Sequence, residues 1–356
     1  MTITQTILDK MKSYLLIIYM LISCQQSTIH EKTPPNEING NPGKIEQVRF
    51  QNGTIGFSGT LFFPAGNGPF TAIAITHGSG KDSKDHPGFI DMAKQFSANN
   101  VVALIYDKRG VGESGGVYTE TPKMEIPAGD LVAAVQYLKS REEVNPLKIG
   151  VYGHSQGGWV APLAATMSED INFLVVSCGG GVSIKKQILY ANRSELKAKG
   201  FTDTEIEEIV TFASPFYDYL GTGLNYENAS KSYNEHKNKS WFVYFKSLGF
   251  GENIPGPGSL SHPVFDFFKA IQYDPMMTEK SLTIPTLVML GEKDAIVPST
   301  MVETAWKTSF DGKNNLTIKI IPNEDHYDFV RIEGNVVYKQ SFKKPLMGFI
   351  ESIQNR

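Results

Sequence analysis

The stretch GVYGHSQGGW, residues 150–159, places Ser155 between Gly153 and Gly157 in the pattern G-x-S-x-G. A continuous apolar run precedes the pattern and a helical pattern follows it, so Ser155 stands where a strand turns sharply into a helix. Such a turn strains the backbone of the serine, and side chains two positions away on either side would collide. The stretch therefore indicates an exposed serine nucleophile, although the motif alone is weak because chance also supplies it.

Strand-like runs recur along the rest of the chain. Continuous apolar runs are typical of strands buried on both faces, and helical patterns lie between most of them. Two alternating β-rich stretches, joined by Asn-Gly, precede these runs and predict an antiparallel hairpin. We expect an α/β fold with a mostly parallel eight-stranded sheet flanked by helices. The eight stretches are residues 45–53, 53–66, 71–76, 101–106, 148–153, 172–177, 286–290 and 316–321.

The alternation is interrupted once. Residues 182–280 carry helical patterns and many aromatic side chains but no clear sheet pattern. We interpret them as a mainly helical cap inserted into an α/β core, which comprises residues 46–181 and 281–356. The aromatic content of the cap favours a substrate with apolar or aromatic groups.

The first 24 residues resemble a lipoprotein signal peptide. Lys10 and Lys12 precede an apolar run at 14–22, which is too short for a comfortable membrane span. The run ends in Leu-Ile-Ser-Cys at 21–24, a pattern similar to the bacterial lipobox. A plain signal peptide or a short anchor helix is the alternative.

Lipidation would make Cys24 the new N-terminus. We then expect an exported protein held to a membrane of the bacterial cell envelope, on its periplasmic or surface side. The polar, proline-containing residues 25–45 would be a flexible tether. Cys178 would be left as a free thiol, and Met11 is an alternative start to Met1.

A serine nucleophile needs a base, and His326 has the expected place in the chain. It follows the last apolar run, and chemistry in such sheets gathers at the carboxyl ends of the strands. His154 is rejected because neighbours on a sharp turn point apart. The histidines weighed are His77, His86, His154, His236, His262 and His326.

The carboxylate that orients this base is expected to be Asp294, which follows the fifth apolar run. Glu292 is a rival, but it comes early in the turn. Asp325 and Asp328 flank His326, and close sequence neighbours rarely orient an imidazole well. We therefore predict Asp294.

An oxyanion would need preorganised N–H donors. The amide of Gln156 is one, because it opens the helix after Ser155 and gains from the helix dipole. The loop HGSG at 77–80 supplies the other, with the amide of Ser79 preferred and that of Gly78 as the alternative. His77 is expected to brace this loop.

The sequence carries no pattern typical of nucleic-acid, metal or dinucleotide binding. The formal net charge of −3 and the lack of a basic stripe argue against a nucleic-acid partner. No Cys/His cluster has zinc spacing, and GVGESGG at 110–116 does not match a dinucleotide fingerprint. We predict neither a metal nor a cofactor.

Five segments together resemble the α/β-hydrolase superfamily, in its esterase, dienelactone-hydrolase-like and serine-aminopeptidase-like branches. They are HGSG, YDKRGVGESGG, GHSQGG, GEKDAIVP and NEDHYDF, in the expected order over roughly 46–180 and 281–356. The resemblance implies that Asp107 and Arg109 shape the loop beside the site.

These patterns predict a serine hydrolase of carboxylic esters with Ser155, His326 and Asp294 as its triad. A peptidase or thioesterase would use the same three residues. A protein of this fold that only binds ligands in the cell envelope is a further alternative.

Overall fold

The computed structural model describes residues 43–246 and 253–356. They form two compact units. The larger comprises the described residues up to Val182 together with Pro275–Arg356, and the smaller comprises those of Ser183–Asp274. Within the described part of the chain, no helix is both long and apolar enough to span a membrane. The predicted signal peptide, Cys24 and most of the tether lie outside the described residues.

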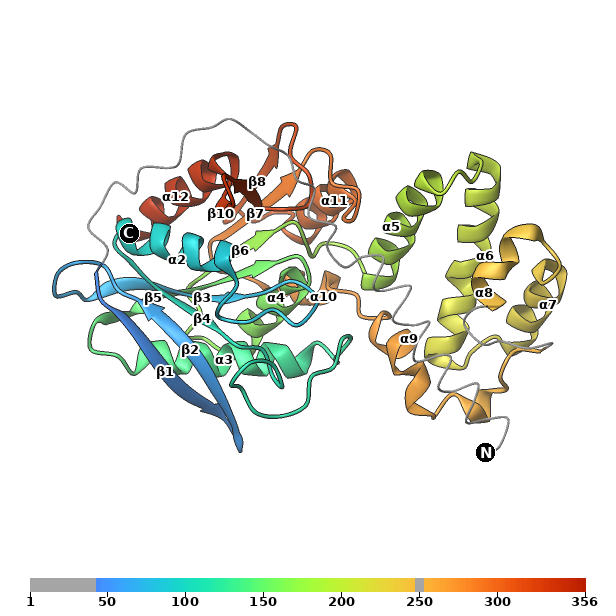
Figure 1. The fold of residues 1–356 in the computed structure, drawn as a ribbon, viewed down its shortest axis with the longest axis horizontal. Helices are drawn as coiled ribbons and strands as arrows, with labels where there is room; N and C mark the ends of the chain where they lie inside the picture. The colour runs from blue at the N-terminus through green and yellow to red at the C-terminus, as the bar shows by residue number, and fades with distance from the viewer. Residues whose placement is uncertain (1–42, 247–252) are drawn as a thin grey trace. The chain divides into compact units, whose positions relative to one another are not determined.

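The larger unit is built on an eight-stranded sheet, as predicted (Figure 1). Its order is β1-β2-β4-β3-β5-β6-β7-β8, in which β1, β2 and β4 pair antiparallel and all later neighbours pair parallel. The strands are β1 (Ile45–Asn52), β2 (Ile55–Phe62), β3 (Phe70–Thr76), β4 (Val101–Tyr106), β5 (Val144–His154), β6 (Phe173–Ser177), β7 (Thr286–Gly291) and β8 (Leu316–Ile321).

A second hairpin was not predicted. Strands β9 (Phe329–Ile332) and β10 (Asn335–Tyr338) pair antiparallel as a separate two-stranded sheet. Glu333 and Gly334 connect them with φ values of 47° and 85°, the left-handed pair typical of a tight two-residue hairpin turn. Each strand has only four residues, too few for alternation to identify it.

Helices cover both faces of the sheet (Figure 1). Helices α2 and α12 pack on one face through Phe89, Phe96, Phe342 and Leu346, while α3 and α4 pack together on the other. The helices of this unit are α2 (Pro87–Ala98), α3 (Glu125–Lys139), α4 (Gly157–Met167), α10 (Met276–Ser281), α11 (Ser299–Ser309) and α12 (Gln340–Gln354).

The smaller unit is helical. Its longest helix, α6, begins with a reciprocal cap between Thr202 and Glu205 and ends at Gly223, whose φ is 73°. The α-helices are α5 (Ile184–Ala198), α6 (Asp203–Thr222), α7 (Tyr226–His236), α8 (Val243–Lys246) and α9 (Asp266–Ala270). Three 3₁₀-helices are η1 (Ser240–Phe242), η2 (Pro257–Ser259) and η3 (Pro263–Phe265).

Aromatic side chains make the core of this smaller unit. Phe212 stacks on Phe216 with ring centroids 5.2 Å apart, and Tyr233 meets Phe242 edge to face. These rings and that of Trp241 are almost fully buried. Their packing explains the aromatic content of residues 182–280, so that content no longer argues for an aromatic substrate.

The smaller unit ends at Asp274, before the sequence-based boundary at residue 280. Helix α10 instead belongs to the larger unit. Its Glu279 is fully buried and accepts hydrogen bonds from the amide of Gly181, at 2.8 Å, and the hydroxyl of Ser309. A buried carboxylate needs such partners, so α10 is fixed to this unit.

Candidate active site

Ser155 stands at the turn between β5 and α4 in a left-handed conformation, with φ of 51°. Such a φ is strained for a side chain other than glycine. A Cβ at Gly153 would lie 2.0 Å from the carbonyl oxygen of Gly157, so only glycine fits there. The Ser155 amide donates to the carbonyl oxygen of Ser177 over 2.9 Å. The backbone thus holds the strained serine in place.

The structure brings three of the predicted residues into one hydrogen-bonded chain. Nε2 of His326 lies 2.9 Å from Oγ of Ser155, and Nδ1 of His326 lies 2.8 Å from Oδ2 of Asp294. Because an ionised carboxylate only accepts hydrogen bonds, Nδ1 carries the proton in the neutral ring. Nε2 is then free of hydrogen and can accept the Ser155 proton.

Two backbone amides hold the carboxylate of Asp294 in place. Its Oδ1 accepts from the amides of Ile296 and Val297, at 2.8 and 2.7 Å. The other oxygen, Oδ2, therefore faces His326. Both side chains are almost completely buried, with Asp294 3% and His326 5% exposed. Water competes little for their hydrogen bond, which strengthens it.

The rival carboxylates serve other parts of the fold. Glu292 accepts from the amide of Asn323, and Asp325 pairs with Lys339 at 3.0 Å. Asp328 points into the core. Among the four carboxylates weighed, Asp294 is the one whose hydrogen bond to His326 the structure shows.

The charge around His326 favours its protonated form. Burial alone lowers the pKa of this imidazole, but the charge and hydrogen bond of Asp294, with smaller effects of Asp328 and Asp325, raise it above its ordinary value. The site therefore stabilises an imidazolium, the form that His326 takes after it accepts a proton.

The two segments predicted to supply the amide donors both border Ser155. Gln156 is the N-cap residue of α4, at the positive end of that helix dipole. Gly78, next to Ser79, runs so close to Ser155 that a Cβ on it would lie 3.2 Å from the serine Cβ. The loop HGSG thus borders Ser155.

The side chain of His77, the first residue of this loop, packs against the core. Its ring is 1% exposed and meets Phe89 edge to face, with ring centroids 4.7 Å apart. Burial holds the pKa of His77 well below its ordinary value, so the ring is neutral. The contact agrees with a bracing role.

The segment after β4 supports the same loop. The carboxylate of Asp107 is fully buried and accepts from the amides of Lys84 and Glu113, each at 2.9 Å. Arg109 binds both carboxylate oxygens of Asp130. Asp107 thus ties together the segments around Lys84 and Glu113, while Arg109 ties the segment after β4 to α3.

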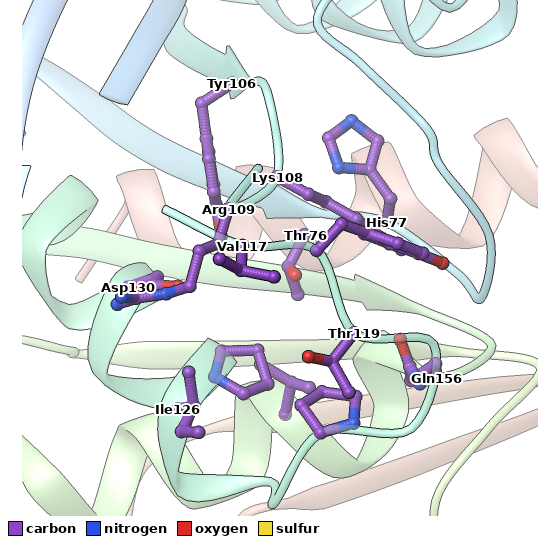
Figure 2. Close-up of a pocket in the computed structure, with 14 residues that line it drawn as sticks. Thr76, His77, Tyr106, Lys108, Arg109, Val117, Thr119, Ile126, Asp130 and Gln156 are labelled. Carbon is purple, nitrogen blue, oxygen red and sulfur yellow. The ribbon is translucent and has the colours of Figure 1, made fainter. Parts of the chain in front are cut away.

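A pocket of about 100 Å³ lies beside Gln156 and His77 (Figure 2). Its apolar wall includes Val117, Ile126 and Val160. The paired Arg109 and Asp130 stand on one side, so their charges largely cancel, and Lys108 lines the pocket with its Nζ bound to carbonyls of the loop HGSG. The pocket therefore suits a small, mainly apolar group.

Sequence reasoning missed a buried polar network behind the site. Asp328, fully buried, accepts from the hydroxyls of Tyr152 and Ser177, the latter at 3.0 Å. Nδ1 of His154 lies 3.2 Å from the same carboxylate. Burial would raise the pKa of Asp328, but His154 and these hydrogen bonds hold it below its ordinary value. No local motif signals this network, since its members come from β5, β6 and the segment before β9.

Cys178 is buried at the end of β6, and burial raises the pKa of its thiol well above the ordinary value. A thiol that stays protonated is a poor nucleophile. In the part of the chain that the structure describes, no cluster of three or more His, Cys, Asp or Glu side chains could hold a metal ion.

Comparison with known proteins identifies the architecture. Residues 68–216 match the family model described as serine aminopeptidase, S33. An esterase of Pyrococcus furiosus, Pf2001, superposes with a TM-score of 0.55 at 15% identity, covering 92% of this chain and 96% of the other. The protein has the α/β-hydrolase fold.

Two further proteins are informative. Est1E of Butyrivibrio proteoclasticus, solved with ferulic acid, has a TM-score of 0.52 at 18% identity, covering 86% of this chain and 98% of Est1E. Esterase EstD of Thermotoga maritima is 26% identical over 80% of this chain. The match spans 62% of EstD, less than two thirds of its length. These similarities support a hydrolase.

Proposed function

We propose that this protein is a serine hydrolase that cleaves carboxylic esters through an acyl-enzyme. The observation that carries the proposal is the hydrogen-bonded chain from Ser155 through His326 to Asp294. Similarity to esterase EstD supports an ester as the substrate.

Ser155 would attack the ester carbonyl carbon while Nε2 of His326 takes the hydroxyl proton. The carbonyl oxygen becomes an oxyanion, which the amides of Gln156 and Ser79 would stabilise. When the carbon–oxygen bond breaks, His326 gives its proton to the leaving alcohol. A water molecule then repeats these steps on the acyl-enzyme and releases the acid.

Asp294 would act through His326 alone. Its hydrogen bond fixes the tautomer that presents a bare Nε2 to Ser155, and its charge stabilises the imidazolium. The raised pKa of His326 agrees with this role.

The pocket beside Gln156 favours a substrate with one small group. An engineered apolar cavity of about 150 Å³ holds benzene, so the smaller pocket here suits a short aliphatic chain. We propose that one side of the ester, with only a few carbons, enters this pocket.

The same three residues would also serve a thioesterase or a peptidase. A thioesterase is supported by thiohydrolase apmlB of Arthrinium phaeospermum, 27% identical over 37% of this chain and 42% of its own length. A peptidase is supported by the family model at 68–216. We also propose that residues 183–274 act as a cap. Comparing the activity of the full chain with that of a chain that lacks these residues would test this.

A substrate series separates these activities. We expect p-nitrophenyl acetate and butyrate to be hydrolysed with the highest kcat/KM, and octanoate at least about tenfold more slowly, since its chain exceeds the pocket. Acyl thioesters and aminoacyl anilides are measured alongside under the same conditions. A higher kcat/KM on anilides than on every ester would replace the esterase proposal by a peptidase.

Export and lipidation at Cys24 remain a proposal that rests on the sequence pattern. Cells that express the full chain are expected to incorporate radiolabelled palmitate into the wild-type protein but not into Cys24→Ser. The variant Cys178→Ser serves as a control, because its thiol is buried and should not matter. Equal incorporation into Cys24→Ser would exclude the lipobox assignment.

A further inference from the structure

Lys108 is a charged residue beside the site to which the proposed reaction assigns no part. It follows β4, lines the pocket of Figure 2, and reaches back to the loop HGSG. Its Nζ donates to the carbonyl oxygen of Gly78 and, at 2.8 Å, to that of Gly80. These two carbonyls flank Ser79, the preferred second donor to the oxyanion.

The contact of Lys108 with the Gly78 carbonyl also fixes the N–H of Ser79, which belongs to the same peptide. The Gly78–Ser79 peptide is trans, so its C=O and N–H point in opposite directions across one rigid plane. A side chain that fixes the Gly78 carbonyl therefore also fixes the direction of the Ser79 N–H. Lys108 holds the carbonyl end of this plane, while Gly78 itself lies against Ser155.

Glu120 holds the next peptide from the same side. Its Oε1 accepts from the amide of Gly80 at 3.1 Å, and its other carboxylate oxygen accepts from the hydroxyl of Tyr118. The backbone carbonyl of Glu120 also accepts, at 3.4 Å, from the side-chain amide of Gln156. The segment after β4 thus contacts Gln156 itself and the two neighbours of Ser79, Gly78 and Gly80.

This contact carries a charge that no carboxylate neutralises directly. Among the ion pairs of the described residues, none includes Lys108. Burial lowers the pKa of its ammonium to about 8, against the opposing effects of Asp82 and Glu120. Keeping a half-buried lysine without an ion pair is costly, and the two carbonyls compensate with charge-assisted hydrogen bonds.

We propose that Lys108 is a positioning residue that orients the Ser79 amide toward the oxyanion by clamping the carbonyls of Gly78 and Gly80. The inference rests on the proposed function. Lys108 lines the pocket proposed for the ester, but its ammonium is bound to the carbonyls of Gly78 and Gly80, so it acts on the reaction through the loop. Its loss would weaken the stabilisation of the oxyanion in the transition state more than the binding of the ground-state ester.

The test compares Lys108→Met, Lys108→Gln and Lys108→Arg with wild type. For p-nitrophenyl butyrate we expect kcat of Lys108→Met to fall about 10- to 100-fold with KM changed less than about threefold, since a full oxyanion donor is worth about 10²- to 10³-fold. The rate of labelling by a fluorophosphonate, whose phosphoryl oxygen needs the same donors, should fall in parallel. Lys108→Arg, which keeps charged donors, should recover most of both rates.

Lys123→Met is the matched control. Lys123 is exposed in the same segment after β4, so its variant removes one positive charge without touching the loop HGSG. It should match wild type. Melting temperatures of all variants show whether a lost rate reflects a lost fold, and Lys108→Gln replaces Lys108→Met if the latter does not fold.

The pH dependence of the wild type gives a second test beside the variants. The titratable groups facing Lys108 are Asp82, Glu120 and His77, and burial keeps the pKa of His77 far below that of the lysine. The labelling rate should therefore decline as pH rises through about 8, where the ammonium loses its proton. A rate that stays flat up to pH 10, together with unchanged kcat in the Lys108 variants, would overturn the clamp. Failure of wild type itself to be labelled would instead refute the proposed serine hydrolase.

Discussion

Replacing Ser155 by alanine is expected to lower kcat on p-nitrophenyl butyrate by about 10⁶-fold, the order found when a serine nucleophile is removed from a triad. The reason is that His326 would be left with no hydroxyl to deprotonate. Labelling by a fluorophosphonate should disappear as well. Fluorescence of the labelled band in a denaturing gel, with wild type beside the variant, measures this directly.

The fold should survive this change. Alanine keeps the Cβ that the serine already carries at φ of 51°, and the hydrogen bond from the residue-155 N–H to the Ser177 carbonyl oxygen is unaffected. A melting temperature within a few degrees of wild type is expected. Ser140→Ala, an exposed serine at the end of α3, is the control and should be labelled normally. If Ser155→Ala were labelled as strongly as wild type, another residue would be the nucleophile.

Asp294→Asn is expected to lower kcat by about 10⁴-fold, as the corresponding change does in other Ser-His-Asp enzymes. Asparagine can donate to Nδ1 of His326, which favours the tautomer with a proton on Nε2. That tautomer cannot accept the proton of Ser155. A pH profile of kcat/KM on p-nitrophenyl butyrate measures both the loss and the state of His326.

The direction in which the acidic limb of this pH profile moves can be predicted. His326 acts as a base only when neutral, so kcat/KM falls as pH decreases through its pKa. Because that pKa is raised in the wild type, the acidic limb should lie above pH 6.5, the ordinary value for histidine. Without the charge of Asp294 the limb should move to lower pH.

The variant Asp325→Asn separates the effect of a nearby negative charge on His326 from the orientation of its ring by Asp294. Asp325 also raises the pKa of His326, but its hydrogen bonds go to Lys339 and the amide of Tyr327. We expect a small shift of the limb to lower pH with the plateau unchanged. Should Asp325→Asn lose the plateau while Asp294→Asn keeps it, the assignment of the carboxylate would be reversed.

The strand layout could be predicted because its signals are local. Each buried strand is a continuous apolar run, and the Asn-Gly turn before β2 is readable from neighbouring residues alone. The β9–β10 hairpin was missed because four-residue strands carry too little periodicity. The smaller unit was predicted as helical, but the meaning of its aromatic residues was not, because packing such as that of Phe212 on Phe216 is invisible in sequence.

The sequence by itself determined the sheet, the strained turn at Ser155 and the order serine, acid, histidine, because backbone conformation and strand burial follow from neighbouring side chains. Asp294 was predicted from its place after β7, but only the tertiary structure shows the contacts that each carboxylate makes. Asp294, Asp325 and Asp328 all lie near strand ends, and their roles depend on which way a rigid turn aims each oxygen. The contact of Lys108 with Gly78 likewise joins residues 30 positions apart in sequence. Such contacts depend on the direction of side chains in three dimensions, which no linear pattern encodes.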